Sequence, residues 1–279
     1  MTNVPLPTRR VTAPNDGKLR PVHKHRSYAT LRAIGALILR EVTTMKSGTS
    51  GGYLWSIAEP VGGVLILTLI FSLGFRTPPM GTNFAIFYAT GVVPFTMYMA
   101  MSGRIANAIT STKSLLAYPA VTFVDALIAR AFVISITQIL IAALVFTGIV
   151  LGMETRTDPQ IEGIVLSITM GLMLGLGVGV MNCFLFSAFP IWEQLWSIIT
   201  KPLFLVSCIF FIFDEVPEPI QKYLWFNPLV HVVGEMRKSF YHSYVGEYVS
   251  PTYVFGVSLA LIALGLGLLI RYHRDLQNS

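Results

Sequence analysis

A basic, polar N-terminal head followed by a series of long apolar stretches constrains this chain more than any other feature of its sequence. Lysine and arginine crowd the head, which contains Arg9, Arg10, Lys18, Arg20, Lys24, Arg26, Arg32, Arg40 and Lys46. Positive charge close to a first membrane span is retained on the cytoplasmic side. We therefore expect an integral membrane protein whose N-terminus lies in the cytoplasm.

Six apolar segments follow the head, and each reaches the ~20 residues needed to cross ~30 Å of hydrocarbon. They cover residues 53–75, 84–106, 120–152, 163–189, 194–213 and 251–272. With the head counted, thirteen lysine and arginine residues fall in the segments that this topology places inside and five in the outer segments, and the outer connection 153–162 is acidic. The sequence predicts an all-α integral membrane protein with six transmembrane helices and both termini cytoplasmic.

The composition supports this class. Hydrophobic residues make up 53% of the chain and charged residues only 12%, against roughly 25% charged residues in soluble proteins. The first thirty residues hold no apolar core of the length that a secretory signal peptide needs, so we expect the first span to direct insertion. The net charge of +6 could suggest nucleic acid, but beside membrane spans it indicates contact with anionic lipid headgroups and no nucleic-acid partner.

The chain divides into three parts. Residues 1–26 lack apolar periodicity and are expected to form a disordered basic cytoplasmic tail. Residues 27–52 begin with apolar side chains that recur every three to four positions between charged ones, which predicts an amphipathic helix in the membrane interface, ended by a Gly- and Ser-rich break. Residues 53–279 form the six-span transmembrane domain.

The outer segment 214–250, before the last span, is the most unusual part of the chain. Its two halves are mixed apolar and charged, are separated at Asn227-Pro228, and are too short to cross the membrane. We expect two short helices that dip into the outer leaflet and return, because non-helical backbone at that depth requires burial in protein or a water-filled cavity. The alternative is an ordinary loop with an amphipathic surface helix. Glu235 and Arg237 are candidates for an internal ion pair or for contact with a polar substrate.

Aromatic residues recur at helical spacings along the second span. They are Phe84, Phe87, Tyr88, Phe95 and Tyr98. Aromatic rings stack on the apolar faces of sugars, so this stripe could line a polysaccharide channel. The alternative is packing or anchoring at the membrane interface, which is the commoner role of aromatic residues in spans.

Charged residues inside the spans are expensive in lipid and should face the bundle interior or lie at an interface. They are Glu59, Asp125, Arg130, Glu193 and Lys201. Asp125 and Arg130 are close enough in sequence to pair, and Lys201 is close enough to the inner face to snorkel. A proton-driven carrier would need several carboxylates near the middle of the membrane, and the sequence lacks them.

Other features of the sequence indicate helix packing, or concern motifs for catalysis, nucleotides and metals that the sequence lacks. Gly171, Gly175 and Gly179 recur every four residues, which allows two helices to approach closely. Cys183 and Cys208 lie in apolar runs, where burial as free thiols is expected. The sequence has no phosphate-binding nucleotide loop and no metal-ligand spacing among its histidines. We therefore expect no catalytic residue, no metal and no cofactor bound by this chain, so any motor is another polypeptide.

Three blocks resemble the membrane subunits of polysaccharide ABC exporters, an ABC-2 type family, and particularly the KpsM-type permeases of capsular polysaccharide export. The blocks are 39–46 (LREVTTMK), 52–60 (GYLWSIAEP) and 225–237 (WFNPLVHVVGEMR). The run 43–47 departs from the family's usual sequence after the Arg-Glu pair. The resemblance extends from about residue 31 to the end of the chain.

The resemblance implies a homodimer in the bacterial inner membrane that is bound to two cytoplasmic KpsT-like ATPase subunits, which hold MgATP. A KpsE-like periplasmic adaptor and a KpsD-like outer-membrane export protein would complete the path. The cargo would be a lipid-linked acidic polysaccharide, moved from cytoplasm to periplasm in contact with membrane lipids.

The family picture also implies a role for each group of site residues. ATPase coupling would fall to Ser111, Thr112, Lys113, Ser114, Leu115 and Glu193. The gate helix and lipid entry would use Arg40, Glu41 and Lys46. The substrate channel would be lined by Tyr53, Trp55, Glu59, Phe87, Tyr88, Phe95, Tyr98 and Lys201. The outer exit would use Trp225, Asn227, Pro228, Glu235, Arg237 and Lys238.

Two alternatives remain open at this point. A permease for another lipid-linked glycan, such as O-antigen or teichoic acid, would share the architecture. A membrane-embedded glycosyl- or acyltransferase would need an acid–base site, for which the only candidate cluster is Asp214, Glu215, His231 and His242.

Overall fold

A computed structural model describes residues 29–47, 52–75, 77–108, 111 and 122–278, and within these ranges every regular element is helical. The predicted tail 1–26 and the coupling residues Thr112, Lys113, Ser114 and Leu115 lie outside the described residues. The helices are α1 (Ala29–Ser47), α2 (Gly52–Gly74), α3 (Phe84–Ala106), α5 (Phe123–Gly152), α6 (Ile161–Ala188), α7 (Pro190–Val206), a 3₁₀ turn η1 (Phe213–Glu215), α8 (Glu218–Leu224), α9 (Pro228–Phe240) and α10 (Pro251–Asn278).

Five of these helices are long and apolar enough to cross a membrane. They cover Trp55–Gly74, Phe84–Ala106, Phe123–Gly152, Ile161–Ala188 and Pro251–Tyr272. The predicted span 194–213 differs most from the structure. The helix observed there, α7, begins earlier, at Pro190, ends at Val206, and has only 17 residues. The chain leaves the helix at Ser207 and Cys208, where Cys208 has a φ of 57°.

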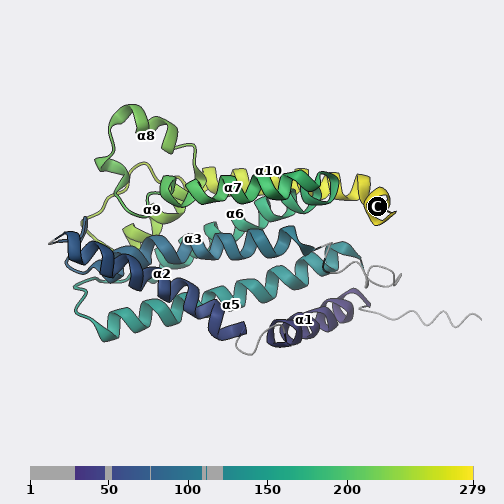
Figure 1. Cartoon of the computed structure of the whole chain (residues 1–279), viewed down its shortest axis with the longest axis horizontal. Helices are drawn as coiled ribbons and strands as arrows, with labels where there is room; N and C mark the ends of the chain where they lie inside the picture. The colour runs from purple at the N-terminus through teal and green to yellow at the C-terminus, as the bar shows by residue number, and fades with distance from the viewer. Residues whose placement is uncertain (1–28, 48–51, 76, 109–110, 112–121, 279) are drawn as a thin grey trace, which may run out of the picture.

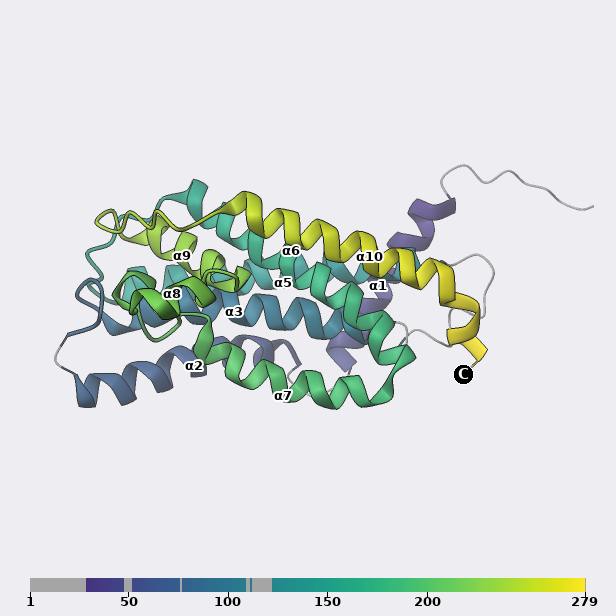
Figure 2. The ribbon, with the colours of Figure 1, turned by 90° about the horizontal axis from the view of Figure 1, so that it is seen from above.

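The long helices run side by side along the longest axis of the molecule (Figure 1). One end of the bundle carries α1 and the end of α10, and the other end carries α8 and α9 (Figure 1). We call these the α1 end and the α8–α9 end. Figure 2 shows α1 crossing its end of the bundle at a steep angle to the long helices.

The helix α3 forms the centre of the bundle. Of its most apolar window, 78% is buried, against 11% for α2 and 22% for α10. It contacts α2, α5, α6 and α9, while α6 also packs against α10. Consequently α2 offers a large exposed apolar face to whatever surrounds a single chain.

The glycine row of α6 makes the close α3–α6 packing geometrically feasible. An added Cβ at Gly175 would lie 2.8 Å from Cβ of Met101, and one at Gly179 would lie 2.7 Å from Cβ of Ile105. Gly177, on the other side of α6, lies against Ser258 of α10. The prediction that these glycines serve helix packing is confirmed, and the partner is within the same chain. The two cysteines are free and buried, as expected.

Candidate functional site

At the α1 end, Arg130 of α5 holds three parts of the chain together. Its Nε and Nη2 donate to the carboxylate of Glu41 on α1, at 2.9 and 3.2 Å. Its Nη1 donates to the carbonyl oxygens of Arg104 and Asn107, at the end of α3, and to the hydroxyl of Ser111 at 2.7 Å. The side chains of Arg130 and Glu41 are only 11% and 18% exposed.

The predicted pairing of Arg130 with Asp125 is wrong. The Asp125 carboxylate accepts hydrogen bonds from the backbone N–H and the hydroxyl of Thr122, while the Thr122 hydroxyl accepts from the Asp125 N–H. This reciprocal arrangement is a capping box that starts α5. It satisfies the first turn locally and leaves Arg130, more than one turn later, free to reach α1.

Other residues assigned to coupling and to the gate also lie at the α1 end. Glu193 is exposed in the first turn of α7, directly after the α6–α7 turn. Arg40 and Glu41 line a small pocket with Leu37, Ala126 and Arg130, where α1 meets α5. Lys46 falls in the last turn of α1.

The aromatic stripe of α3 is buried within a single chain. Phe87 and Tyr88 are 0% exposed, Tyr98 is 3% exposed and Phe95 is 6% exposed. The Phe95 ring packs edge-on against the Phe204 ring of α7, with 5.1 Å between the ring centres. Within a single chain these rings therefore pack against neighbouring helices, as in the packing alternative, and their assignment to a substrate channel stays a prediction.

The remaining channel candidates belong to α2 and α7, and those whose exposure the structure describes are exposed. Trp55 is 76% exposed and Glu59 is also exposed. Lys201 lies on the exposed surface of α7, which has no buried residue. Tyr53 belongs to the first turn of α2. In Figure 2, α2 and α7 both lie along one side of the bundle.

At the α8–α9 end, Arg237 is buried beneath α9. Its Nη1 and Nη2 donate to the carbonyl oxygens of Phe211 and Ile209, at 2.7 and 2.8 Å, and its guanidinium carbon lies 4.5 Å from the centre of the Phe87 ring. Burial lowers the pKa of Arg237. The expected ion pair with Glu235 does not form, because the guanidinium turns toward the chain after α7. Arg237 is 0% exposed, so a passing polymer would not touch it here.

The other residues of the predicted exit divide between fold and surface. Asn227 starts α9 by accepting from the Leu229 N–H at 3.1 Å, with Pro228 in the first turn. The Trp225 indole donates to the Tyr248 carbonyl at 3.3 Å. Glu235 is 7% exposed, and burial raises its pKa. Of the six, Lys238 is the one that is exposed on α9.

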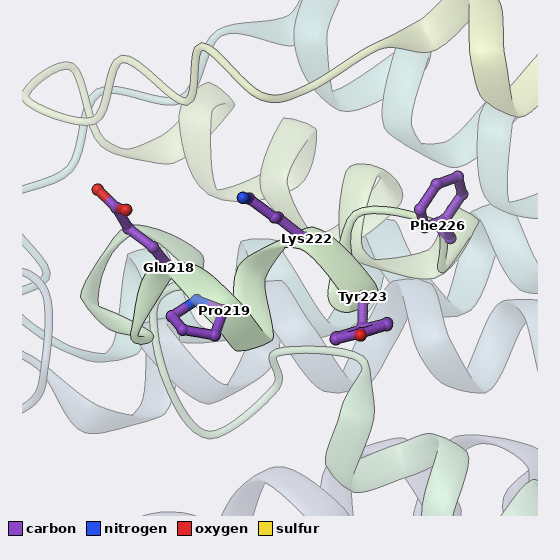
Figure 3. A pocket seen from close by; sticks show the side chains of 5 residues that line it. All are labelled: Glu218, Pro219, Lys222, Tyr223 and Phe226. Atoms are coloured by element: carbon purple, nitrogen blue, oxygen red, sulfur yellow. The ribbon is translucent and has the colours of Figure 1, made fainter.

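A surface pocket at α8 was not predicted from the sequence. It has a volume of about 450 Å³ and is lined by Glu218, Pro219, Lys222, Tyr223 and Phe226. Figure 3 shows Glu218 and Lys222 on one face of α8, and Pro219 and Tyr223 on another. Tyr223 is 81% exposed and Phe226 is 67% exposed. The available signal was the spacing of the charged pair Glu218 and Lys222, four residues apart, and of the aromatic pair Tyr223 and Phe226, three residues apart.

Comparison with known proteins decides the family. Residues 32–241 match the model of the ABC-2 type transporter family. The chain belongs to this family.

The ABC-2 relatives align with this chain over most of its length. The polysialic acid transport protein KpsM of Escherichia coli is 32% identical over 236 residues, which cover 84% of this chain and 91% of KpsM. The capsule polysaccharide export inner-membrane protein CtrC of Neisseria meningitidis serogroup A is 26% identical, over 88% and 93% of the two chains. The O-antigen export system permease RfbA of Klebsiella pneumoniae is 24% identical, over 79% and 85%.

Sequence reasoning missed the role of Arg130 in this ABC-2 chain because its partners lie far away along the chain. Glu41 is 89 residues distant and the Arg104 carbonyl 26. The available signal was the cost of a charge in an apolar helix, which requires a partner. It identified the residue as needing one, but not the helix that supplies it.

Proposed function

We propose that this chain is the channel-forming inner-membrane subunit of an ATP-driven exporter that moves a lipid-linked acidic capsular polysaccharide from cytoplasm to periplasm. The observation that carries the proposal is the alignment with KpsM and CtrC over most of both chains. KpsM is named a polysialic acid transport protein, and CtrC is named a capsule polysaccharide export inner-membrane protein.

In the proposed topology six segments cross the membrane, and both termini are cytoplasmic. The sixth segment is α7, whose 17 residues span about 26 Å and run along the bundle on the same side as α2 (Figure 2). An even number of crossings agrees with the position of α1 and the end of α10 at the same end (Figure 1). The α1 end is then the cytoplasmic end.

The proposal assigns α1 to the membrane interface as the gate helix. Leu39 is 70% exposed and Val42 38% exposed, while Glu41 faces α5. Exposed apolar side chains on a helix that crosses the bundle end steeply suit the boundary between headgroups and acyl chains. The lipid anchor of the cargo would enter beside this helix, near Arg40, Glu41 and Lys46.

The two helices α8 and α9 correspond to the expected short pair in segment 214–250, and we propose that they dip into the outer leaflet and shape the exit. The burial of α9 against α6 and α3 supports this, because backbone at that depth must be covered by protein. Lys238 and the pocket beside Lys222 and Tyr223 would then meet the emerging anionic polymer.

We propose a homodimer that encloses the channel between the exposed faces of α2 and α7 of the two copies. A bundle of this size makes a thin wall for a glycan-wide pore, and α2 is the least buried of the apolar helices. Trp55 and Lys201 would line the route, whereas Glu59 lines a pocket with residues of α3 and α5. Two KpsT-like ATPase subunits would bind MgATP and dock against segment 111–115 and Glu193, and the periplasmic adaptor and outer-membrane protein would continue the path.

Deletion of the gene tests the transport function. Fractionation and glycan staining should find full-length polymer trapped in the cytoplasm, and the intact gene should restore surface polymer. Absence of polymer from every compartment would indicate a biosynthetic enzyme, and unchanged surface polymer would exclude this cargo.

Deletion of residues 111–115 tests the coupling assignment separately. Export should cease while the subunit remains inserted, because the ATPase would no longer drive the spans. Persistence of normal export would contradict the assignment of this segment, without bearing on the transport function.

A second candidate is export of O-antigen, which the similarity to RfbA supports. The same deletion discriminates between them when the trapped polymer is analysed for its sugar composition and its lipid terminus.

A further inference from the structure

A polar pocket lies between α2, α3 and α5, close to the α1 end. It has a volume of about 300 Å³, within the range of small-ligand sites, and is lined by Ser56, Glu59, Pro60, Thr96, Met99, Ala100, Gly103, Arg104 and Gln138. We call it the α2–α5 pocket. Arg104 lies in the last turn of α3, and Thr96 lies about 12 Å nearer the start of that helix. The pocket therefore extends from the bundle end into the apolar zone.

Gln138 is the observation that points to a ligand. Its side chain is 7% exposed, and within the described part of the chain its amide has no hydrogen-bond partner, although it lines the pocket. The amide is not among the fully buried polar atoms without a partner, so it is open to the pocket. An occupant that offers both a donor and an acceptor would satisfy it.

The pocket also carries two opposite charges on different walls. Glu59 stands on α2 and Arg104 on α3. Glu59 takes part in none of the ion pairs among the described residues. A guanidinium is suited to a phosphate, which it can bind through two parallel hydrogen bonds, and a carboxylate is suited to an ammonium group. The two walls thus match a zwitterionic headgroup.

An apolar groove flanks the same crossing of α2 and α5. It is lined by Ile57, Thr137, Leu140, Ile141 and Leu144 and has a volume of about 140 Å³. Ile57 follows Ser56 and Thr137 precedes Gln138 in the sequence, so the groove and the pocket are lined by neighbouring residues of the same two helices. Leu140 and Leu144 are 64% and 55% exposed. An acyl chain can lie along this groove while its headgroup occupies the pocket.

From this geometry we infer that the α2–α5 pocket binds a zwitterionic glycerophospholipid of the bilayer, with its phosphate at Arg104, its ammonium group at Glu59 and its glycerol esters at Gln138. A sugar is the weaker fit, because no aromatic ring lines the pocket to stack on it. A purely anionic lipid, such as a phosphate-bearing anchor of the exported glycan, would leave Glu59 without a partner. The bound lipid fills the gap between α2 and the rest of the bundle.

The test uses the permease purified with its ATPase subunits, stripped of lipid, and then titrated with phosphatidylethanolamine or phosphatidylglycerol during native mass spectrometry. The wild-type complex should retain the ethanolamine lipid about tenfold more tightly than the glycerol lipid. Glu59→Gln should abolish that preference. Gln138→Leu, which keeps the side-chain volume, should weaken retention of both lipids.

Two exposed positions provide matched controls. Gln194→Leu on α7 and Glu162→Gln on α6 make the same chemical changes outside the pocket and should leave retention unchanged. Equal retention of both lipids by the wild type, or an unaltered preference in Glu59→Gln, overturns the inference.

The source of the lipid is tested with complexes isolated from cells that do or do not make the polymer. A bilayer lipid should copurify from both. A lipid found only in complexes from polymer-producing cells would be the anchor of the cargo, and would overturn the assignment to the bilayer.

Discussion

Arg130 on α5 and Glu41 on α1 are 89 residues apart in the sequence, yet they form a two-pronged ion pair with N–O distances of 2.9 and 3.2 Å. The same guanidinium reaches the end of α3 and the Ser111 hydroxyl. One side chain thus connects the proposed gate helix with the start of the proposed coupling segment. Movement of one of these two segments would therefore be transmitted to the other through the Arg130 side chain.

Breaking this ion pair should impair export more than insertion. Glu41→Gln and Arg130→Gln each leave a largely buried charge or polar group without its partner, which costs about 3 kcal/mol. We expect export to fall at least severalfold in each single variant, while ATP hydrolysis by the complex continues.

A double-mutant cycle separates the pair from the individual residues. The combined variant should be less impaired than the sum of the two singles, with a coupling energy of about 1–3 kcal/mol in thermal unfolding. Arg271→Gln, at an exposed arginine of α10, is the control and should behave as the wild type. If the effects of the two single substitutions were additive, the contact between Glu41 and Arg130 would contribute nothing of its own to stability.

The α3–α6 contact should tolerate no added methyl group at its glycine row. In Gly175→Ala the new Cβ would meet Met101 Cβ at 2.8 Å and the Tyr98 carbonyl oxygen at 2.9 Å, so the helices must separate. We expect a loss of about 1–3 kcal/mol in the free energy of unfolding. Gly148→Ala on α5, where nothing lies within 4 Å, should instead gain up to about 1 kcal/mol. Equal unfolding midpoints of Gly175→Ala and the wild type in detergent would contradict the close packing of α3 against α6.

Sequence periodicity and hydropathy predicted most of the helices because both properties are local. The span predicted at 84–106 coincides with α3, and the break at Asn227-Pro228 separates α8 from α9. The span predicted at 194–213 was less accurate. Its apolar composition continues past Val206, but the chain turns at Cys208 and supplies the carbonyl oxygens of Ile209 and Phe211 to Arg237.

The sites were predictable only where local chemistry identified them. The stripe spacing put Phe87 and Tyr88 on a helix, but it could not show that α3 is buried without a break from Ala85 to Phe95. The helices α6 and α9, which help to cover it, follow much later in the chain. Hydropathy could not separate Arg237 from Lys238 either. They are adjacent and equally charged, yet one is buried and the other exposed, because α9 lies flat on the bundle.

That difference between the two neighbours predicts opposite outcomes for the same change. Arg237→Met leaves the carbonyl oxygens of Phe211 and Ile209 without these donors, so we expect a loss of about 1–3 kcal/mol in stability for each and faster modification of the buried Cys208 thiol. Lys238→Met should change stability by less than about 0.5 kcal/mol. If Arg237→Met reduced export with no change in unfolding midpoint or thiol reactivity, Arg237 would be a polymer contact after all.

The stability of the α8–α9 end should depend on pH through His231. The ring is 0% exposed. Its Nε2 lies 2.8 Å from the Trp225 carbonyl, to which it must donate, and its Nδ1 accepts from the Ser250 N–H at 3.2 Å. These two bonds require the neutral imidazole, and burial lowers the pKa of His231.

The sign of the pH effect follows from proton binding. Below the unfolded-state pKa of about 6.5 the unfolded chain binds a proton at His231 that the folded chain does not, so stability falls as the pH decreases. The slope approaches about 1.4 kcal/mol per pH unit until the lowered folded-state pKa is reached.

Thermal unfolding between pH 7.5 and pH 5 measures this slope. His231→Gln retains a side-chain donor for the Trp225 carbonyl but does not titrate, so it should be less stable at neutral pH and should show a shallower dependence on pH. His242→Gln changes an exposed histidine and should keep the slope of the wild type. A slope that survives His231→Gln would mean that another group carries the pH dependence.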